Sequence, residues 1–297
     1  MAASCYVGCN LPSTSHEEYM IALRTSSARL LLMLGFFVLA SFAARAEETP
    51  AQDGRLNDVT AGDHRSEKNK ARDKYRHPAE TLTFFGIRPD MTVVEIYPGR
   101  GWYTEVLAPY LKGNGTLYAA EHPGDPSYAP LQMSLDAFDK KIKDAPELYG
   151  DVKRTKLTKE GDIAPSGSAD LVVTFRNVHS LMRSGSEQEA FAAMFKALKP
   201  GGVLGVVQHR GDPNVKQDPK GGKGYVNEDY VIELVEKAGF ELADKSEINA
   251  NPRDTKDYAK GVWTLPPSLR LGDEDRYQYV AIGESDRMTL KFVKPAQ

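Results

Sequence analysis

Short runs of consecutive apolar residues recur along most of this chain, and helical patterns separate them. The runs predict strands, and they lie at residues 93–96, 116–120, 171–175, 203–207, 240–243 and 288–293, with a weaker strand candidate at 151–157 that contains Lys and Arg. Apolar residues at helical spacing predict helices at 102–111, 131–142, 187–198 and 228–238. Apolar strands that alternate with helices are typical of a parallel sheet covered on both faces. The sequence therefore predicts a doubly wound α/β fold.

Two long segments interrupt this alternation. Residues 209–225 are rich in Gly, Lys and Asp, and residues 249–286 form a polar and aromatic insert with three prolines. Loops of this length in a compact domain are usually lids, binding loops or disordered segments. The aromatic residues of the second segment argue against disorder, so we expect Tyr258 and Trp263 either to cover a substrate or to pack in the core.

The amino-terminal segment has the three parts of a secretory signal. Arg24 and Arg29 precede an apolar run at 30–42, which is followed by the small-x-small triplet 44–46. The run is shorter than the roughly 20 residues that span a membrane. We therefore expect residues 1–46 to be a cleaved signal peptide and the protein to be periplasmic or secreted, with no stable membrane anchor after cleavage. An uncleaved anchor is the alternative.

The rest of the chain divides into a linker and one domain. Translation could begin at Met20, because the preceding residues are an unusual start for a signal. Residues 47–65 are polar and read as a linker, and 66–297 as one domain that opens with a charged helix at 67–76 and a short helix from Pro78.

Charge and cysteine content exclude several classes of protein. Of the 297 residues, the part after residue 46 carries 35 basic and 39 acidic side chains, a net charge of −4. This is not the basic surface of a nucleic-acid binder. Both cysteines, Cys5 and Cys9, precede the signal, so the mature chain would have no disulfide and no cysteine metal ligand.

The first strand leads into a glycine turn that predicts a nucleoside site. Gly99 and Gly101 follow the strand, and Glu121 ends the second strand 22 residues after Gly99. Glycine lets the backbone approach a ligand, and an acid at the second strand can accept hydrogen bonds from ribose hydroxyls. A nicotinamide site prefers a third glycine where this chain has Thr104, and its fingerprint does not include Glu95.

These motifs resemble those of class I S-adenosylmethionine-dependent methyltransferases. The similar segments are Val93-Val-Glu-Ile, Gly99-x-Gly101, Glu121, Asp170-Leu-Val-Val-Thr-Phe and Leu198-Lys-Pro-Gly-Gly202. The chain looks most like a group of methyltransferases, often with secretory signals, that carry segments similar to Arg76–Glu80 and Thr174–His179. The resemblance implies a seven-stranded sheet whose last strand is antiparallel.

The resemblance also implies roles for individual residues. Glu95 and the Gly99–Gly101 turn would hold the methionine part of S-adenosylmethionine, and Glu121 its ribose. Asp162, with Glu160 close behind, would contact the adenine. Tyr97 stands where the family has its first loop glycine, and with Pro98 it narrows the space beside the amino-acid part of the cofactor.

Three residues after the fourth and fifth strands are candidates for contact with the substrate. His179 and His209 could act as bases if the methyl acceptor must lose a proton, although either could instead satisfy a backbone carbonyl. Arg176 could bind the cofactor or a substrate carboxylate, or belong to a structural network. We expect no metal, because no third ligand accompanies the histidines.

The sequence thus favours an S-adenosylmethionine-dependent methyltransferase that acts on a small molecule. One alternative is a catalytically inactive binding protein with the same cleft, and a less favoured one is a nicotinamide-dependent oxidoreductase. The sequence does not indicate the oligomeric state or the methyl acceptor.

Overall fold

The computed structural model describes residues 54–159 and 161–296. The expected signal peptide at 1–46, the possible start at Met20 and both cysteines lie outside the described residues. Within the described ranges, no helix is long and apolar enough to cross a membrane.

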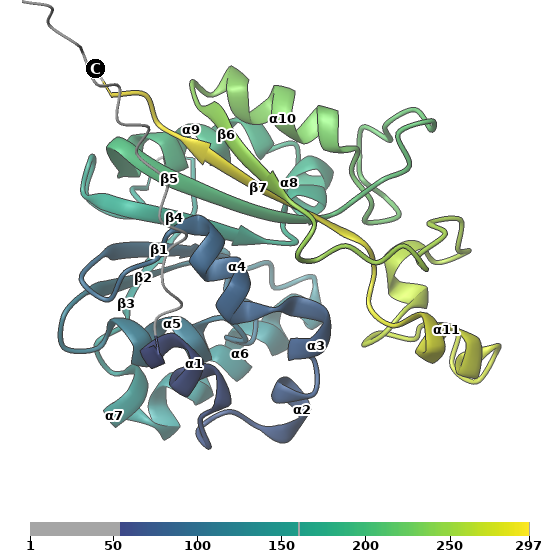
Figure 1. Cartoon of the computed structure of the whole chain (residues 1–297), viewed down its shortest axis with the longest axis horizontal. Coiled ribbons are helices and arrows are strands. Elements are labelled where there is room, and N and C mark those ends of the chain that lie inside the picture. Colours follow the sequence, from purple (N-terminus) through teal and green to yellow (C-terminus); the bar gives the residue numbers. More distant parts are fainter. Residues whose placement is uncertain (1–53, 160, 297) are drawn as a thin grey trace, which may run out of the picture. The chain divides into compact units, whose positions relative to one another are not determined.

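The described part of the chain is built on a seven-stranded sheet, with strand order β3-β2-β1-β4-β5-β7-β6 (Figure 1). The strands are β1 (Thr92–Ile96), β2 (Thr116–Glu121), β3 (Lys153–Lys156), β4 (Ala169–Phe175), β5 (Leu198–His209), β6 (Glu241–Ser246) and β7 (Arg287–Val293). Neighbouring strands are parallel except at β7, which is antiparallel to both β5 and β6. The predicted fold class, including the antiparallel last strand, is confirmed.

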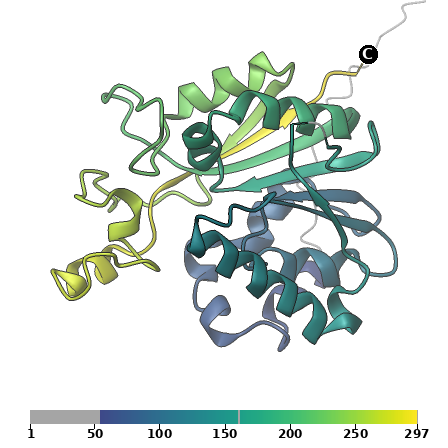
Figure 2. The ribbon, with the colours of Figure 1, turned by 180° about the vertical axis from the view of Figure 1, so that it is seen from behind.

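Helices cover both faces of this sheet (Figures 1 and 2). On one side lie α1 (Gly54–Ala61), α4 (Pro78–Phe85), α5 (Thr104–Leu111), α6 (Ala129–Asp144) and α7 (Pro146–Tyr149). On the other side lie α8 (Val178–Ser184), α9 (Glu187–Ala197) and α10 (Glu228–Lys237). The remaining helices are α2 (Glu67–Lys70), α3 (Asp73–Arg76), the 3-10 turn η1 (Gly261–Thr264) and α11 (Arg276–Ile282).

The core forms two apolar layers separated by the sheet. Val93 and Val173 face the layer of α4 and α5, whereas Val94 and Val172 face the layer of α8 to α10. Successive residues of a strand point to opposite faces, so unbroken apolar runs are needed wherever both faces are covered. This explains why apolar runs located the central strands.

The structure corrects two expectations about the polar segments and adds detail to a third. Residues 54–61 of the expected linker form α1, whose Leu56 is buried against the α5 layer. A single buried residue leaves no periodic pattern of apolar positions, so the sequence did not predict this helix. The charged helix expected at 67–76 is two short helices, α2 and α3. The insert at 249–286 is ordered and contains η1 and α11.

Candidate functional site

The turn after β1 has the left-handed backbone conformation that its glycines suggested. Gly99 and Gly101 have φ values of 62° and 77°, and Tyr97 is also left-handed at 47°. A Cβ added at Gly101 would lie 2.9 Å from Cδ of Lys141 and 3.1 Å from the ring of Phe138. Glycine is therefore needed at 101 both for its conformation and for the close approach of α6.

A cavity of about 170 Å³ opens beside this turn. It is formed by the loops that follow β1, β2 and β4 and by one face of α6, and its lining residues are Tyr97, Pro98, Gly99, Glu121, His122, Leu131, Ser134, Leu135, Phe138, Asn177 and Ser180. Strand order reverses between β1 and β4, which is where open α/β sheets usually bind ligands. The cavity thus occupies the expected place for a small ligand.

Glu121 lines this cavity but is already paired. Nε and Nη2 of Arg154 donate to its two carboxylate oxygens at 2.6 Å and 2.9 Å. Nη1 of Arg154 also donates to Asp139 of α6 at 2.9 Å. Arg154 was not predicted as a site residue, because it lies in a short, charged edge strand.

Helix α6 covers one side of the cavity, but few of its own residues are buried. Phe138 is the only residue of α6 that is fully buried. The ion pair of Lys141 with the buried carboxylate of Glu105 adds to this contact. The more exposed pair of Arg154 with Asp139 contributes little to stability. Helix α6 is therefore held by Phe138, by partly buried residues such as Ile142 and by the Lys141 ion pair.

Glu95 lies in the buried middle layer and does not line the cavity. Its Oε2 accepts a hydrogen bond from the Thr104 hydroxyl at 2.6 Å. Burial raises the pKa of Glu95 to about 7, against the lowering effects of the Thr104 hydrogen bond and of Lys141. The side chain therefore changes charge near neutral pH.

The structure brings the two candidate histidines together at the ends of β4 and β5. The ring centroids of His179 and His209 are 5.6 Å apart, and Trp263 of the insert lies against His179 at 5.9 Å. Nδ1 of His209 is 2.5 Å from the Ser285 hydroxyl. Burial lowers the pKa of His179 to about 4 and that of His209 well below its usual value, so both are neutral at pH 7.

The other two candidates lie in different surroundings. Asp162 is half exposed, pairs with Lys196 at 2.6 Å and does not line the cavity. Arg176 directly follows β4 with a left-handed φ of 65°, an unusual conformation for a non-glycine residue. Burial, followed by repulsion from Arg287, lowers the pKa of Arg176 to about 10. Among the described residues, no group of side chains has the composition of a metal site.

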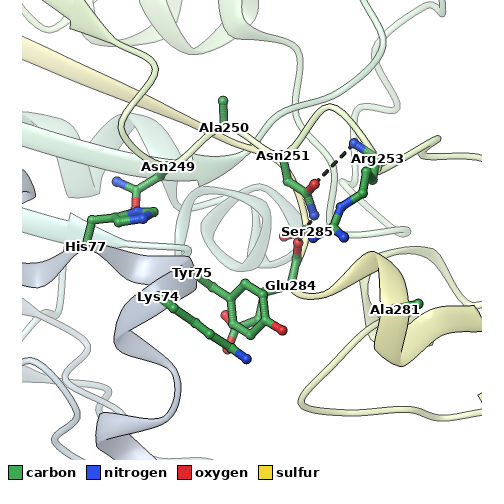
Figure 3. Close-up of a pocket in the computed structure, with 10 residues that line it drawn as sticks. All are labelled: Lys74, Tyr75, His77, Asn249, Ala250, Asn251, Arg253, Ala281, Glu284 and Ser285. Atoms are coloured by element: carbon green, nitrogen blue, oxygen red, sulfur yellow. Dashed lines mark hydrogen bonds between the residues drawn. The ribbon is translucent and has the colours of Figure 1, made fainter. Parts of the chain in front are cut away.

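A second cavity, of about 410 Å³, opens between α3 and the start of β7 (Figure 3). Lys74 and Tyr75 line one side and residues 249–251 another, while Glu284 and Ser285 reach it from the segment before β7. Glu284 and Ser285 also contact Arg76 and His209, respectively. Sequence reading missed both residues, because they belong to a polar stretch at the end of the insert.

Comparison with known proteins identifies the fold. No protein family model and no curated protein matches the sequence. Among solved structures, a SAM-dependent methyltransferase from Aquifex aeolicus matches 75% of this chain and 93% of its own, with a TM-score of 0.51 and 15% identity. The [4+2]-cyclase SpnF matches 82% of this chain and 92% of its own, with a TM-score of 0.52 and 16% identity.

A third match is phosphoethanolamine N-methyltransferase 2 from Haemonchus contortus, solved in complex with S-adenosyl-L-methionine. It covers 74% of this chain and 53% of its own, with a TM-score of 0.50 and 16% identity. At these identities the likeness establishes the fold, and it is the Rossmann-like fold of class I methyltransferases.

The residues around the smaller cavity suit part of such a cofactor. A carboxylate at Glu121, the ring of His122 and the apolar side chains of Leu135 and Phe138 match the chemistry of a nucleoside. Small-molecule pockets usually enclose about 300 Å³ or more, whereas this one encloses about 170 Å³. A complete S-adenosylmethionine would therefore extend beyond this cavity.

Proposed function

We propose that this protein is an S-adenosylmethionine-dependent methyltransferase that acts on a small molecule. The observation that carries the proposal is the position of the cavity, between the Gly99 turn and Glu121 and at the point where strand order reverses. The fold shared with methyltransferases and the nucleoside-like chemistry of the lining residues support it.

In this proposal Glu121 holds the ribose, while Tyr97 and the Gly99–Gly101 turn lie around the methionine part. Glu95, which does not line the cavity, would reach the methionine part only by leaving Thr104. Asp162 stays as a proposed cofactor contact that would have to leave Lys196. Of the two ligands expected for Arg176, the cofactor and a substrate carboxylate, we keep the substrate carboxylate. When bound, the cofactor supplies a methyl group on a positively charged sulfur. The chain itself contributes alignment of the acceptor.

His179 and His209 are the proposed proton acceptors. Both are neutral at pH 7, so each has a nitrogen lone pair available. The Ser285 hydroxyl is in hydrogen-bond contact with Nδ1 of His209. This contact would leave Nε2 of His209 as the atom that faces a substrate.

One observation favours a competing function. Arg154 already neutralises Glu121, and the cavity is small, which would suit a binding protein that has no transferase activity. Calorimetry on the purified protein with S-adenosylmethionine, S-adenosylhomocysteine and NAD separates the possibilities. The methyltransferase proposal requires binding of the first two, and their failure to bind at about 1 mM, the weak end of the ordinary affinity range, would refute it.

The Glu121→Gln variant tests the cofactor site. Loss of hydrogen bonds to the ribose should weaken S-adenosylhomocysteine binding by about 1–3 kcal/mol, or roughly ten- to hundredfold. Asp139→Asn is the matched control, because it disturbs the other ion pair of Arg154 and leaves Glu121 intact. Equal affinities for both variants and the unmodified protein would contradict the assignment.

We also propose that the protein is exported to the periplasm or secreted. The basic, apolar and small-residue pattern of residues 24–46 supports this location. Amino-terminal sequencing of the exported form should find a new terminus near Glu47.

A further inference from the structure

Three arginine side chains surround one buried carboxylate beside the candidate histidines. Nε of Arg72 and Nε of Arg76 donate to Glu284 at 2.6 Å and 3.0 Å, and Arg287 donates to it as well. Burial alone would raise the pKa of Glu284, but Arg287, Arg76 and Arg72 outweigh it and hold that pKa far below the usual range. Glu284 is therefore fully ionised and contributes a single negative charge.

The arginines have more hydrogen-bond donors than this carboxylate can satisfy. Nη1 and Nη2 of Arg76, Nη2 of Arg72 and Nε of Arg287 are buried without an acceptor among the described residues. Arg76 itself is only 2% exposed. A buried donor without a partner destabilises the folded state, and more so when it is charged. Such a set of donors calls for an acceptor that the described residues do not supply.

Arg176 adds a fourth guanidinium to this group. It directly follows Phe175, whose ring stacks on Tyr103, and the Tyr103 hydroxyl donates to the carbonyl oxygen of Arg76 at 3.4 Å. Its backbone N–H donates to the Val207 carbonyl, two residues before His209, at 2.6 Å. Burial is the main cause that lowers the pKa of Arg76, and repulsion from Arg176 comes next, ahead of attraction by Glu284. Arg287 is in turn the strongest charged neighbour of Arg176. Arg72, Arg76, Arg176 and Arg287 thus bring four positive charges to one carboxylate, which leaves an excess of three at neutral pH.

The arginine cluster lies next to the two candidate histidines. The guanidinium of Arg76 lies over the Trp102 ring at 4.7 Å, and the rings of Tyr103 and Phe175 stack on each other at 3.4 Å. Arg287 of β7 is the cross-strand partner of His209 of β5, and Ser285, next to Glu284, contacts Nδ1 of His209. A negative group bound by these arginines would therefore lie close to the two histidines.

We propose that Arg76, Arg176 and Arg287 form a binding site for an oxyanion, a carboxylate or a phosphate, carried by a small molecule. Guanidinium groups match both oxyanions in charge and hydrogen-bond geometry. Because the site adjoins His179 and His209, the oxyanion belongs to the methyl acceptor. This last step rests on the proposed function, whereas the anion site itself does not.

Thermal unfolding and calorimetry of the purified protein test the site with sodium phosphate and sodium acetate. A ligand of the folded state raises the unfolding midpoint as its concentration rises. We expect saturable binding of at least one of the two anions, beyond any effect of sodium chloride at equal ionic strength, and the preferred anion identifies the oxyanion. Failure of both anions to bind saturably would overturn the proposal.

Variants of Arg176 separate binding from structural support. Arg176→Gln should weaken the preferred anion at least about tenfold, as expected when a charged hydrogen bond is lost. Without anion, the thermal unfolding midpoint of Arg176→Gln should not fall below that of the unmodified protein. The substitution removes a positive charge that repels the neighbouring arginines. Arg176→Lys keeps the charge without the planar fork and should give an intermediate affinity. A fall in the midpoint with unchanged anion affinity would identify a structural arginine and refute the site.

Arg183→Gln is the matched control. Arg183 is exposed over Trp263, and its charge also reaches His179, so this change removes one nearby positive charge outside the cluster. Equal loss of anion affinity in Arg183→Gln and Arg176→Gln would overturn the site in favour of a general charge effect.

Competition with S-adenosylhomocysteine tests whether the oxyanion belongs to the cofactor or to the methyl acceptor. Displacement of phosphate or acetate by S-adenosylhomocysteine would assign the site to the cofactor and refute the acceptor assignment. Anion binding without any cofactor binding would refute the methyltransferase proposal and leave the anion site standing.

Discussion

At the scale of single residues, Glu95 makes the stability of the folded state depend on pH. Its carboxyl group is buried next to the glycine turn, and burial raises its pKa from 4.5 to about 7. The folded state therefore prefers the protonated form. The stabilisation that comes from this preference is fully present below pH 4.5 and is lost as pH rises through 7.

The Glu95→Gln variant should remove this dependence. Glutamine resembles the protonated acid and can still accept the Thr104 hydrogen bond. Urea unfolding should show that the variant gains up to roughly 3 kcal/mol over the unmodified protein between pH 4.5 and pH 8. If the difference in unfolding free energy between the variant and the unmodified protein stays constant over this pH range, Glu95 remains charged in the folded protein.

At the scale of elements, α6 differs from the neighbouring helix α5. Seven of the eight residues of α5 are buried, whereas α6 buries only Phe138 over 16 residues. Elements with little buried apolar surface open more easily than the core. The helix that closes the small cavity is thus held less firmly than α5.

Hydrogen exchange measures this difference directly. We expect amides of α6 to exchange faster than those of α5, because opening α6 exposes only one large apolar side chain. S-adenosylhomocysteine should then slow exchange in α6 and in residues 97–101. Equal protection of both helices without ligand would contradict a movable cover over the cavity.

The sequence predicted the main elements and two residues, Gly99 and Glu121, that line the candidate cavity, for a physical reason. Strands buried on both faces need unbroken apolar runs, so β1, β4 and β5 were visible in the sequence. Gly99 and Glu121 were visible because their spacing follows from one strand, turn and helix. Arg76 and Glu284 were not, because they lie 208 residues apart and each resembles an ordinary surface charge in a polar segment.

At the scale of the whole domain, one close contact fixes how α4 packs on the sheet. A Cβ at Gly205 of β5 would lie 2.5 Å from the ring of Phe85 at the end of α4. The helix can approach the strand this closely only because residue 205 has no side chain. Val203 and Val207 continue the apolar strand on the same face.

Gly205→Ala should therefore lower the free energy of unfolding by about 1–3 kcal/mol, as overpacking does in other cores. Urea unfolding measures the change. Gly54→Ala is the control: no heavy atom lies within 4 Å of its added Cβ, so its effect should stay within about 0.5 kcal/mol. A smaller Phe85→Leu side chain should restore part of the loss, and failure of this rescue would point to another cause.

The antiparallel direction of β7 has a consequence for the timing of biosynthesis. Because β7 runs against β5, its beginning lies at the edge where the parallel strands end, with His209 paired to Arg287. Glu284, Ser285 and Arg287 thus reach the site from a segment that is synthesised after the other six strands of the sheet, since a chain grows from its amino terminus. A nascent chain that ends before β7 can already hold the glycine turn and Glu121, but it has neither the carboxylate that contacts the arginines nor the serine beside His209. Synthesis of β7 is therefore a precondition for the proposed anion site.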